Sequence, residues 1–382
     1  MQTVRAVTES SVRQASLSPA AIRRGARQKG PDLAMARSRA EVRHGNRSGS
    51  ARSVARRHGT GRSSGRIQAR GGEAGFGKTD SEASAFSRLP CTGKVRHVLQ
   101  GHTDAVEFVA FSPNGQRLAT GSSDKHVRLW DVESGESIAV LQGHQNRVFD
   151  LTFLDPNRLV SASMDRTLRL WDTASGVTLR VFQGHQEGVV GVAVKDEHLY
   201  SASNDGTVRR WSLQLQSAFT VIDLPEGPRS AAIAPHGSQV AVGFADGGLR
   251  LYALPDGRLL WGKAGAHSDN VKRLTFSPDG QQLASASFDK TVKLWQTSDG
   301  QLVQTFSGHR DSVHAVAFSP DGQSLATASY DGQLGLFRIG EEQGRFYKAH
   351  DGHVNSVTFD PSGKRLVSTG DDGAVRLWDL RA

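Results

Sequence analysis

The sequence predicts an all-β fold made of seven consecutive copies of one small antiparallel sheet. The first observation behind this prediction is a histidine, usually preceded by Gly, that returns every 41 or 42 residues with one gap of 82. The second is an Asp that stands six residues before Trp or another aromatic residue. The third is period-two apolar alternation interrupted by turn residues, which is typical of strands and hairpins. The anchoring histidines are His102, His144, His185, His267, His309 and His350.

Each copy reads as four strands. In the first copy the apolar runs cover residues 106–111, 117–120, 127–130 and 137–141. The turn Pro113-Asn114-Gly115 separates the first two runs, and Ser134-Gly135 precedes the fourth. Such turn residues favour antiparallel hairpins. One four-stranded sheet cannot bury both of its faces alone, so neighbouring copies must pack against each other.

The fullest copy runs from Gly101-His102 through Phe111-Ser112-Pro113 and Asp124 to Trp130-Asp131. This motif recurs at this spacing over residues 95–382, and it resembles the repeat of the WD-repeat (WD40) β-propeller family. The resemblance implies a seven-bladed β-propeller, with one four-stranded antiparallel sheet per blade around a central channel.

The same resemblance implies that the repeated His residues are structural. In the family, each joins a hydrogen-bonded set of His, Ser or Thr, Asp and Trp inside one blade, so that buried polar groups supply one another's partners. A metal site or acid–base catalysis is the competing interpretation, but the histidines belong to different copies. The expected sets are His102, Thr120, Asp124 and Trp130; His144, Ser161, Asp165 and Trp171; His185, Ser201, Asp205 and Trp211; His267, Ser285, Asp289 and Trp295; His309, Thr327 and Asp331; and His350, Ser368, Asp372 and Trp378.

Two copies depart from the pattern. In copy four the anchoring His is missing, Val242 stands where Ser is expected, and Asp246 is followed six residues later by Tyr252. In copy six Phe337 replaces Trp and has no N–H to donate. We therefore expect blade four to be the least ordered of the seven.

The ends of the repeat region predict how the ring closes. Copy seven contains only three apolar runs before the sequence stops, whereas an additional run at residues 95–99 precedes the first anchoring His. We expect residues 95–100 to supply the fourth strand of blade seven, which would remove two exposed sheet edges.

Residues 1–94 have a different composition and predict a disordered, Arg/Ser/Gly-rich tail. They hold 19 basic and 6 acidic residues, against 28 and 32 in the rest of the chain. A mitochondrial transit peptide and weak nucleic-acid contact by residues 57–72 are alternatives for this tail. Residues 72–79 also match the phosphate-binding loop G-x-x-x-x-G-K-[ST], but the sequence offers neither the preceding strand nor room for a nucleotide domain.

Composition limits the remaining classes. The single cysteine, Cys91, excludes an intrachain disulfide and a zinc site of several thiolates. No apolar run approaches the ~20 residues that span a bilayer. We therefore expect a cytoplasmic protein, with a mitochondrial or nuclear location as the alternative that the basic tail suggests.

No nucleophile–base pair or metal cluster stands out, so we expect a protein that is not an enzyme and that has no cofactor and no metal. The resemblance implies partner binding on the face where the first strand of each blade begins. Three positions in each copy point to that face. They are the residues three and five after the anchoring His, and the residue before the Asp that stands six residues before the aromatic residue, which we call the turn Asp. The candidate residues are Arg147, Phe149, Met164, Lys272, Phe288, His314, Tyr330 and His353.

The expected function is a scaffold that binds a protein or peptide, as a monomer or as a subunit of a larger complex. A Phe or Tyr before a turn Asp is not required for folding, because Ser123 and Asn204 occupy the same position. The alternative is that Phe288 and Tyr330 only pack between blades. An RNA-associated scaffold that uses the basic tail, or a regulatory propeller related to a kinase or nucleotide-hydrolysing protein, remains open as an alternative function.

Overall fold

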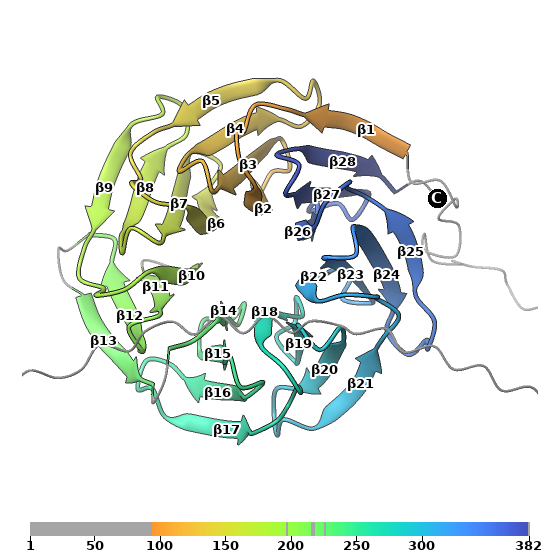
Figure 1. Ribbon diagram of the computed structural model, residues 1–382. Helices are drawn as coiled ribbons and strands as arrows, with labels where there is room; N and C mark the ends of the chain where they lie inside the picture. Colours follow the sequence, from red (N-terminus) through yellow and green to blue (C-terminus); the bar gives the residue numbers. More distant parts are fainter. Residues whose placement is uncertain (1–93, 196–197, 215–217, 225–226, 381–382) are drawn as a thin grey trace, which may run out of the picture. The chain divides into compact units, whose positions relative to one another are not determined.

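A computed structural model describes residues 94–195, 198–214, 218–224 and 227–380. These residues form seven four-stranded antiparallel sheets. The sheets stand as blades around a central channel (Figure 1), so the expected all-β, seven-bladed architecture is confirmed. No helix in these ranges has the length and apolar character needed to cross a membrane.

The blades are built alike, from an innermost strand at the channel to an outer strand at the rim (Figure 1). The innermost strands are β2 (Val106–Phe111), β6 (Val148–Asp155), β10 (Val189–Lys195), β14 (Ser230–Ile233), β18 (Val271–Phe276), β22 (Val313–Phe318) and β26 (Val354–Phe359). The second strands are β3 (Arg117–Ser122), β7 (Arg158–Ser163), β11 (His198–Ser203), β15 (Gln239–Gly243), β19 (Gln282–Ser287), β23 (Ser324–Ser329) and β27 (Arg365–Gly370). The third strands are β4 (Val127–Asp131), β8 (Leu168–Asp172), β12 (Thr207–Ser212), β16 (Leu249–Ala253), β20 (Val292–Gln296), β24 (Gln333–Arg338) and β28 (Val375–Asp379). The outer strands are β5 (Ser137–Leu141), β9 (Thr178–Phe182), β13 (Ala218–Asp223), β17 (Leu259–Lys263), β21 (Leu302–Phe306), β25 (Arg345–Lys348) and β1 (Lys94–Leu99).

The turn between the first and second strands shows why the sequence folds locally in this way. In blade one, the Ser112 hydroxyl donates to Asn114 Oδ1 at 2.7 Å and accepts from the backbone N–H of Arg117 at 2.9 Å. Gly115 has a φ of 69°, in the left-handed region that glycine adopts without a steric penalty. The Phe-Ser-Pro-Asn-Gly sequence therefore sets the turn and the register of the strands beside it.

The hydrophobic core lies between neighbouring blades. One cluster joins Leu129 and Leu141 of blade one to Val148, Leu159 and Trp171 of blade two, all of them at most 1% exposed. In the five blades that have this Trp, the indole packs in the same way against the preceding blade. Because every sheet covers the apolar face of its neighbour, no blade is a stable unit by itself.

The last blade combines strands from both ends of the repeat region. β1 runs antiparallel to β28, with Leu99 opposite Val375 and Val95 opposite Trp378. Leu99 is 3% exposed and packs in a cluster that also contains Val106 of blade one. The strand begins at Lys94, which the sequence had assigned to the tail. Residues 1–93, including the phosphate-loop motif at 72–79, lie outside the described residues.

Blade four keeps the four strands but replaces its polar set with apolar packing. Val242 and Phe244 are fully buried, and Tyr252 is 7% exposed. The Arg250 guanidinium lies 4.8 Å from the centre of the Phe244 ring. Apolar side chains in blade four therefore occupy the place of the buried hydrogen-bonded set found in the other blades.

We predict that blade four opens more readily than blade two. Its backbone amides in β15 and β16 should exchange with deuterium at least about tenfold faster than those in β7 and β8, because the local stabilisation from buried side-chain hydrogen bonds is missing. Hydrogen exchange followed by mass spectrometry measures this directly. Equal protection in the two blades would contradict the prediction.

Candidate functional site

A hydrogen-bonded chain in blade two links the middle of the sheet to the turn that carries a candidate binding residue. The Trp171 indole N–H donates to Ser161 Oγ at 2.8 Å, and Ser161 Oγ lies 2.7 Å from His144 Nε2. His144 Nδ1 lies 2.7 Å from Asp165 Oδ2. Since the hydroxyl accepts from the indole, its own proton points to Nε2. His144 therefore carries its proton on Nδ1 and donates it to the carboxylate.

The same hydrogen-bonded set recurs in blades one, three, five and seven, and in blade six without the indole. His Nδ1 lies 2.7–3.0 Å from the carboxylate, and His Nε2 lies 2.7–2.9 Å from the hydroxyl. The structure thus brings together, within single blades, the sets His102–Thr120–Asp124–Trp130, His185–Ser201–Asp205–Trp211, His267–Ser285–Asp289–Trp295, His309–Thr327–Asp331 and His350–Ser368–Asp372–Trp378. In blade six no indole takes part, because Phe337 packs against Phe306 and Phe346 instead.

The surroundings of Asp165 and His144 determine the charge that each carries. Burial opposes ionisation of Asp165, but hydrogen bonds from His144, Thr167 and the backbone of Gln145 outweigh it and hold its pKa below the ordinary value. Burial lowers the pKa of His144, although Asp165 opposes the shift. A neutral histidine beside a carboxylate that already accepts several hydrogen bonds is a rigid support for the turn.

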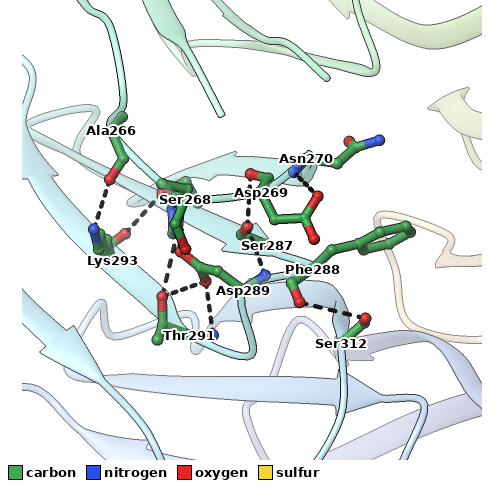
Figure 2. Close-up of polar contacts among 12 residues, drawn as sticks. Ala266, Ser268, Asp269, Asn270, Ser287, Phe288, Asp289, Thr291, Lys293 and Ser312 are labelled. Atoms are coloured by element: carbon green, nitrogen blue, oxygen red, sulfur yellow. Dashed lines mark hydrogen bonds and ion pairs between the residues drawn. The ribbon is translucent and has the colours of Figure 1, made fainter. Parts of the chain in front are cut away.

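Blade five shows how this support positions a candidate binding residue. Asp289 accepts hydrogen bonds from the Thr291 hydroxyl at 2.6 Å and from the backbone N–H of Ser268 at 3.2 Å. Phe288 precedes it, and its backbone N–H donates to the Asn270 carbonyl at 3.0 Å. The Phe288 ring points away from the polar cluster around Asp289 (Figure 2). The Asp turn therefore fixes the backbone while the preceding side chain projects outward.

Four of the eight candidate residues form one stacked row, which we call the aromatic ladder: Phe288, His314, Tyr330 and His353. Ring centres lie 5.6 Å apart for Phe288 and His314, 4.1 Å for His314 and Tyr330, and 3.9 Å for Tyr330 and His353. The ladder crosses blades five, six and seven. His314 is 6% exposed and supports the rings on either side, whereas Phe288, Tyr330 and His353 are partly exposed.

The remaining candidates lie elsewhere on the same face. Lys272 Nζ reaches across the channel from blade five to within 4.6 Å of the Phe149 ring centre in blade two. Arg147 is exposed and lies 3.7 Å from Glu107 of blade one. Met164 packs against Gly188 of blade three, where an added Cβ would stand 2.5 Å from its sulfur. These four therefore do not join the ladder in one continuous stack.

One residue further along the innermost strands, a second contact crosses the channel. Arg273 lies 3.6 Å from the buried Asp150 and 4.3 Å from the centre of the Phe108 ring. A cavity of about 450 Å³ extends from this pair along the channel to the turns at Pro113 and Pro361. Arg273 and Asp150 thus pair within the lining of this cavity.

Sequence reasoning missed several residues of this face. Glu107 and Asn355 stand five positions after an anchoring His, and Asp371 stands before a turn Asp, so the position rule covers all three. Asp371 lies 2.8 Å from His353 Nδ1 and accepts from the Asn355 amide at 2.8 Å. Applying the rule to acidic residues and to Asn, as well as to basic and aromatic ones, would have found them.

The histidines do not converge on a common ion. Within the described ranges no group of three His, Cys, Asp or Glu side chains is placed to hold a metal. The anchoring His, the Ser or Thr and the turn Asp of each set lie inside one blade, where they bond to one another. The face that carries the aromatic ladder therefore presents charged side chains and flat rings that a partner can contact.

Comparison with known proteins gives the same repeat. A family model described as "WD domain, G-beta repeat" matches six segments that together cover more than half of the chain: 93–131, 135–172, 176–212, 262–296, 300–338 and 341–379. These matches leave out most of blade four, whose sequence departs from the repeat in the way described above.

Individual relatives are similar over part of the chain. "Periodic tryptophan protein 2" of Arabidopsis thaliana is 32% identical over 54% of this chain and 19% of its own length. "Nuclear distribution protein nudF" of Emericella nidulans is 30% identical over 56% of this chain and 64% of its own length. The chain therefore spans less than two thirds of either protein. "Serine-threonine kinase receptor-associated protein" of Dictyostelium discoideum is 28% identical over 58% of this chain and 78% of its own length.

Proposed function

Because the chain belongs to the WD-repeat family, whose propellers are generally non-enzymatic scaffolds for protein interaction, we propose that it binds a protein or peptide partner on the face that carries the aromatic ladder. Action as a monomer or as a subunit of a larger complex in the cytoplasm is part of the proposal. The names of the relatives support it, since one describes association with a receptor.

The observation that carries the proposal is the ladder itself. Phe288 and Tyr330 precede turn aspartates at positions where Ser123 and Asn204 suffice in other blades. Flat, partly exposed rings held in a fixed stack lose little conformational entropy on binding, and aromatic residues dominate binding energy at protein interfaces.

We predict that replacing Phe288 and Tyr330 together with Ala weakens partner binding by about 30-fold or more, the effect of losing an interface hot spot of about 2 kcal/mol. Affinity capture with the full chain as bait, followed by quantitative mass spectrometry, measures the loss. Circular dichroism checks that the variant remains folded.

The matched control is Phe219→Ala, which removes an aromatic side chain that is 55% exposed on the outer strand β13, away from the ladder. This control should capture the same partners as the unchanged chain. If the double variant also captures them equally, the two rings serve only to pack between blades and the proposal is wrong.

A further inference from the structure

Lys272 is a partly buried cation that lacks a carboxylate partner. Its ammonium group contacts the face of Phe149 at 4.6 Å. Among the described residues, no oxygen atom lies within hydrogen-bonding or ion-pair distance of Nζ. An ammonium has three N–H donors, and taking it out of water without acceptors is unfavourable. Within the described residues the side chain therefore presents a positive charge that forms neither a hydrogen bond nor an ion pair, and it is only partly buried.

The charges around Lys272 do not neutralise it. The groups that act on it are Arg273 on its own strand, Glu107 on β2, Arg229 before β14 and Arg147 before β6, and burial together with the guanidinium groups lowers its pKa to about 8. The one carboxylate among them, Glu107, already accepts from the Ser123 hydroxyl at 2.6 Å and pairs with Arg147. This part of the face consequently has an excess of positive charge.

The aromatic ladder lies within electrostatic range of Lys272. Lys272 acts electrostatically on His314, whose pKa is lowered, first by burial, to about 2. His314 is therefore neutral, and its buried Nε2 has no hydrogen-bond partner. The Asn270 Oδ1 atom is also buried without a partner. The Asn270 side chain extends in the same direction as Phe288 (Figure 2). Two buried polar atoms without a hydrogen-bond partner thus lie in the ladder or on the residue whose carbonyl bonds Phe288.

We propose that Lys272 and the aromatic ladder together bind a peptide segment that carries an Asp or Glu side chain next to a flat apolar residue, either aromatic or Pro. This inference rests on the proposed function and names the chemistry of its partner. The carboxylate pairs with the Lys272 ammonium, and the flat residue lies against Phe288 and Tyr330. A single carboxylate matches one unpaired ammonium, whereas phosphate groups favour the bidentate geometry of arginine, and Arg147 and Arg273 already have carboxylate neighbours.

The test is selection from a phage-displayed library of random dodecapeptides on the immobilised full chain. The unchanged chain should enrich peptides with Asp or Glu beside an aromatic residue or Pro. Lys272→Met keeps most of the apolar stem and removes the charge, so it should lose the acidic preference. The matched control is Lys263→Met on the outer strand β17, an exposed lysine away from this face, which should select the same peptides as the unchanged chain.

A selected peptide then separates the contributions. Changing its Glu to Gln should weaken binding to the unchanged chain at least about tenfold, the value of one charged hydrogen bond, and should hardly affect binding to Lys272→Met. Equal binding of the Glu and Gln peptides, or tighter binding of a phosphoserine peptide than of the Glu peptide, overturns the carboxylate assignment.

The remaining outcomes distinguish this inference from the proposed function. Enrichment that depends on Phe288 and Tyr330 but shows no acidic preference overturns the inference and leaves the proposed function standing. Enrichment that survives the double variant Phe288→Ala and Tyr330→Ala, or no enrichment at all, counts against the proposed function and the inference with it.

Discussion

Removal of strand β1 will lower the melting temperature of the propeller by about 4–20 °C, because a buried leucine contact of about 2–5 kcal/mol is lost and a domain of this size changes by about 2–4 °C per kcal/mol. Leu99 is 3% exposed against the first blade, and five residue pairs join β1 to β28. Without β1, the edge of β28 and an apolar seam between the last and first blades become exposed.

The measurement compares a chain that begins at residue 91 with one that begins at residue 101, by thermal unfolding. Two single variants refine it, because neighbouring residues face opposite ways. Leu99→Ala should destabilise by about 2–5 kcal/mol. Val98→Ala, at a side chain 48% exposed, should stay within about 0.5 kcal/mol. Similar melting of the two truncated chains would show that the ring does not depend on this strand.

Ion pairs at the same junction contribute less than the apolar contact. Glu133 of blade one contacts Arg96 of β1 and lies 3.1 Å from Arg365 of β27, but its side chain is 73% exposed. Exposed pairs of this kind are worth about 0–1 kcal/mol and weaken with salt. The effect of removing β1 should therefore persist at high ionic strength.

The sequence predicts the parts of the fold that are set within one repeat. The expected run at residues 106–111 coincides with β2, because alternating apolar residues and a Pro-containing turn define it locally. Trp171, Ser161, His144 and Asp165 could be assigned to one set because each copy repeats the same spacing. The ring closure could be inferred from one missing run and one additional run.

Contacts between distant blades could not be predicted in the same way. The position rule placed Phe288, His314 and Tyr330 on one face, but the stacking order depends on how far neighbouring blades rotate. The contact between Lys272 and Phe149 joins blades two and five across the channel, and no local pattern encodes that separation. Periodicity therefore specifies the blades, whereas their spatial arrangement creates the binding face.

Replacing Asp165 with Ala will destabilise the propeller by about 3 kcal/mol, in the range observed when one partner of a buried polar pair is removed. The carboxylate accepts from His144 at 2.7 Å, from the Thr167 hydroxyl at 2.6 Å and from two backbone N–H groups at 3.0 Å. The variant leaves the buried His144 Nδ1 proton with only the Thr167 hydroxyl, 3.5 Å away, as a neighbouring acceptor. Denaturant unfolding at pH 7 measures the loss, and Trp171→Phe is the control, because blade six already has Phe337 at that position.

The pH dependence identifies the carboxylate as the cause. Because the folded pKa of Asp165 is lowered from its ordinary value of 3.8, the unfolded chain binds the proton first as the pH falls. The stability that the unchanged chain gains over Asp165→Ala is thus fully present above about pH 5 and decreases below about pH 4. Trp171→Phe changes no titrating group, so its difference from the unchanged chain should be nearly independent of pH. An Asp165→Ala difference that is small at pH 7, or that grows as the pH falls below 4, would show that the turn is held by backbone packing rather than by the ionised side chain.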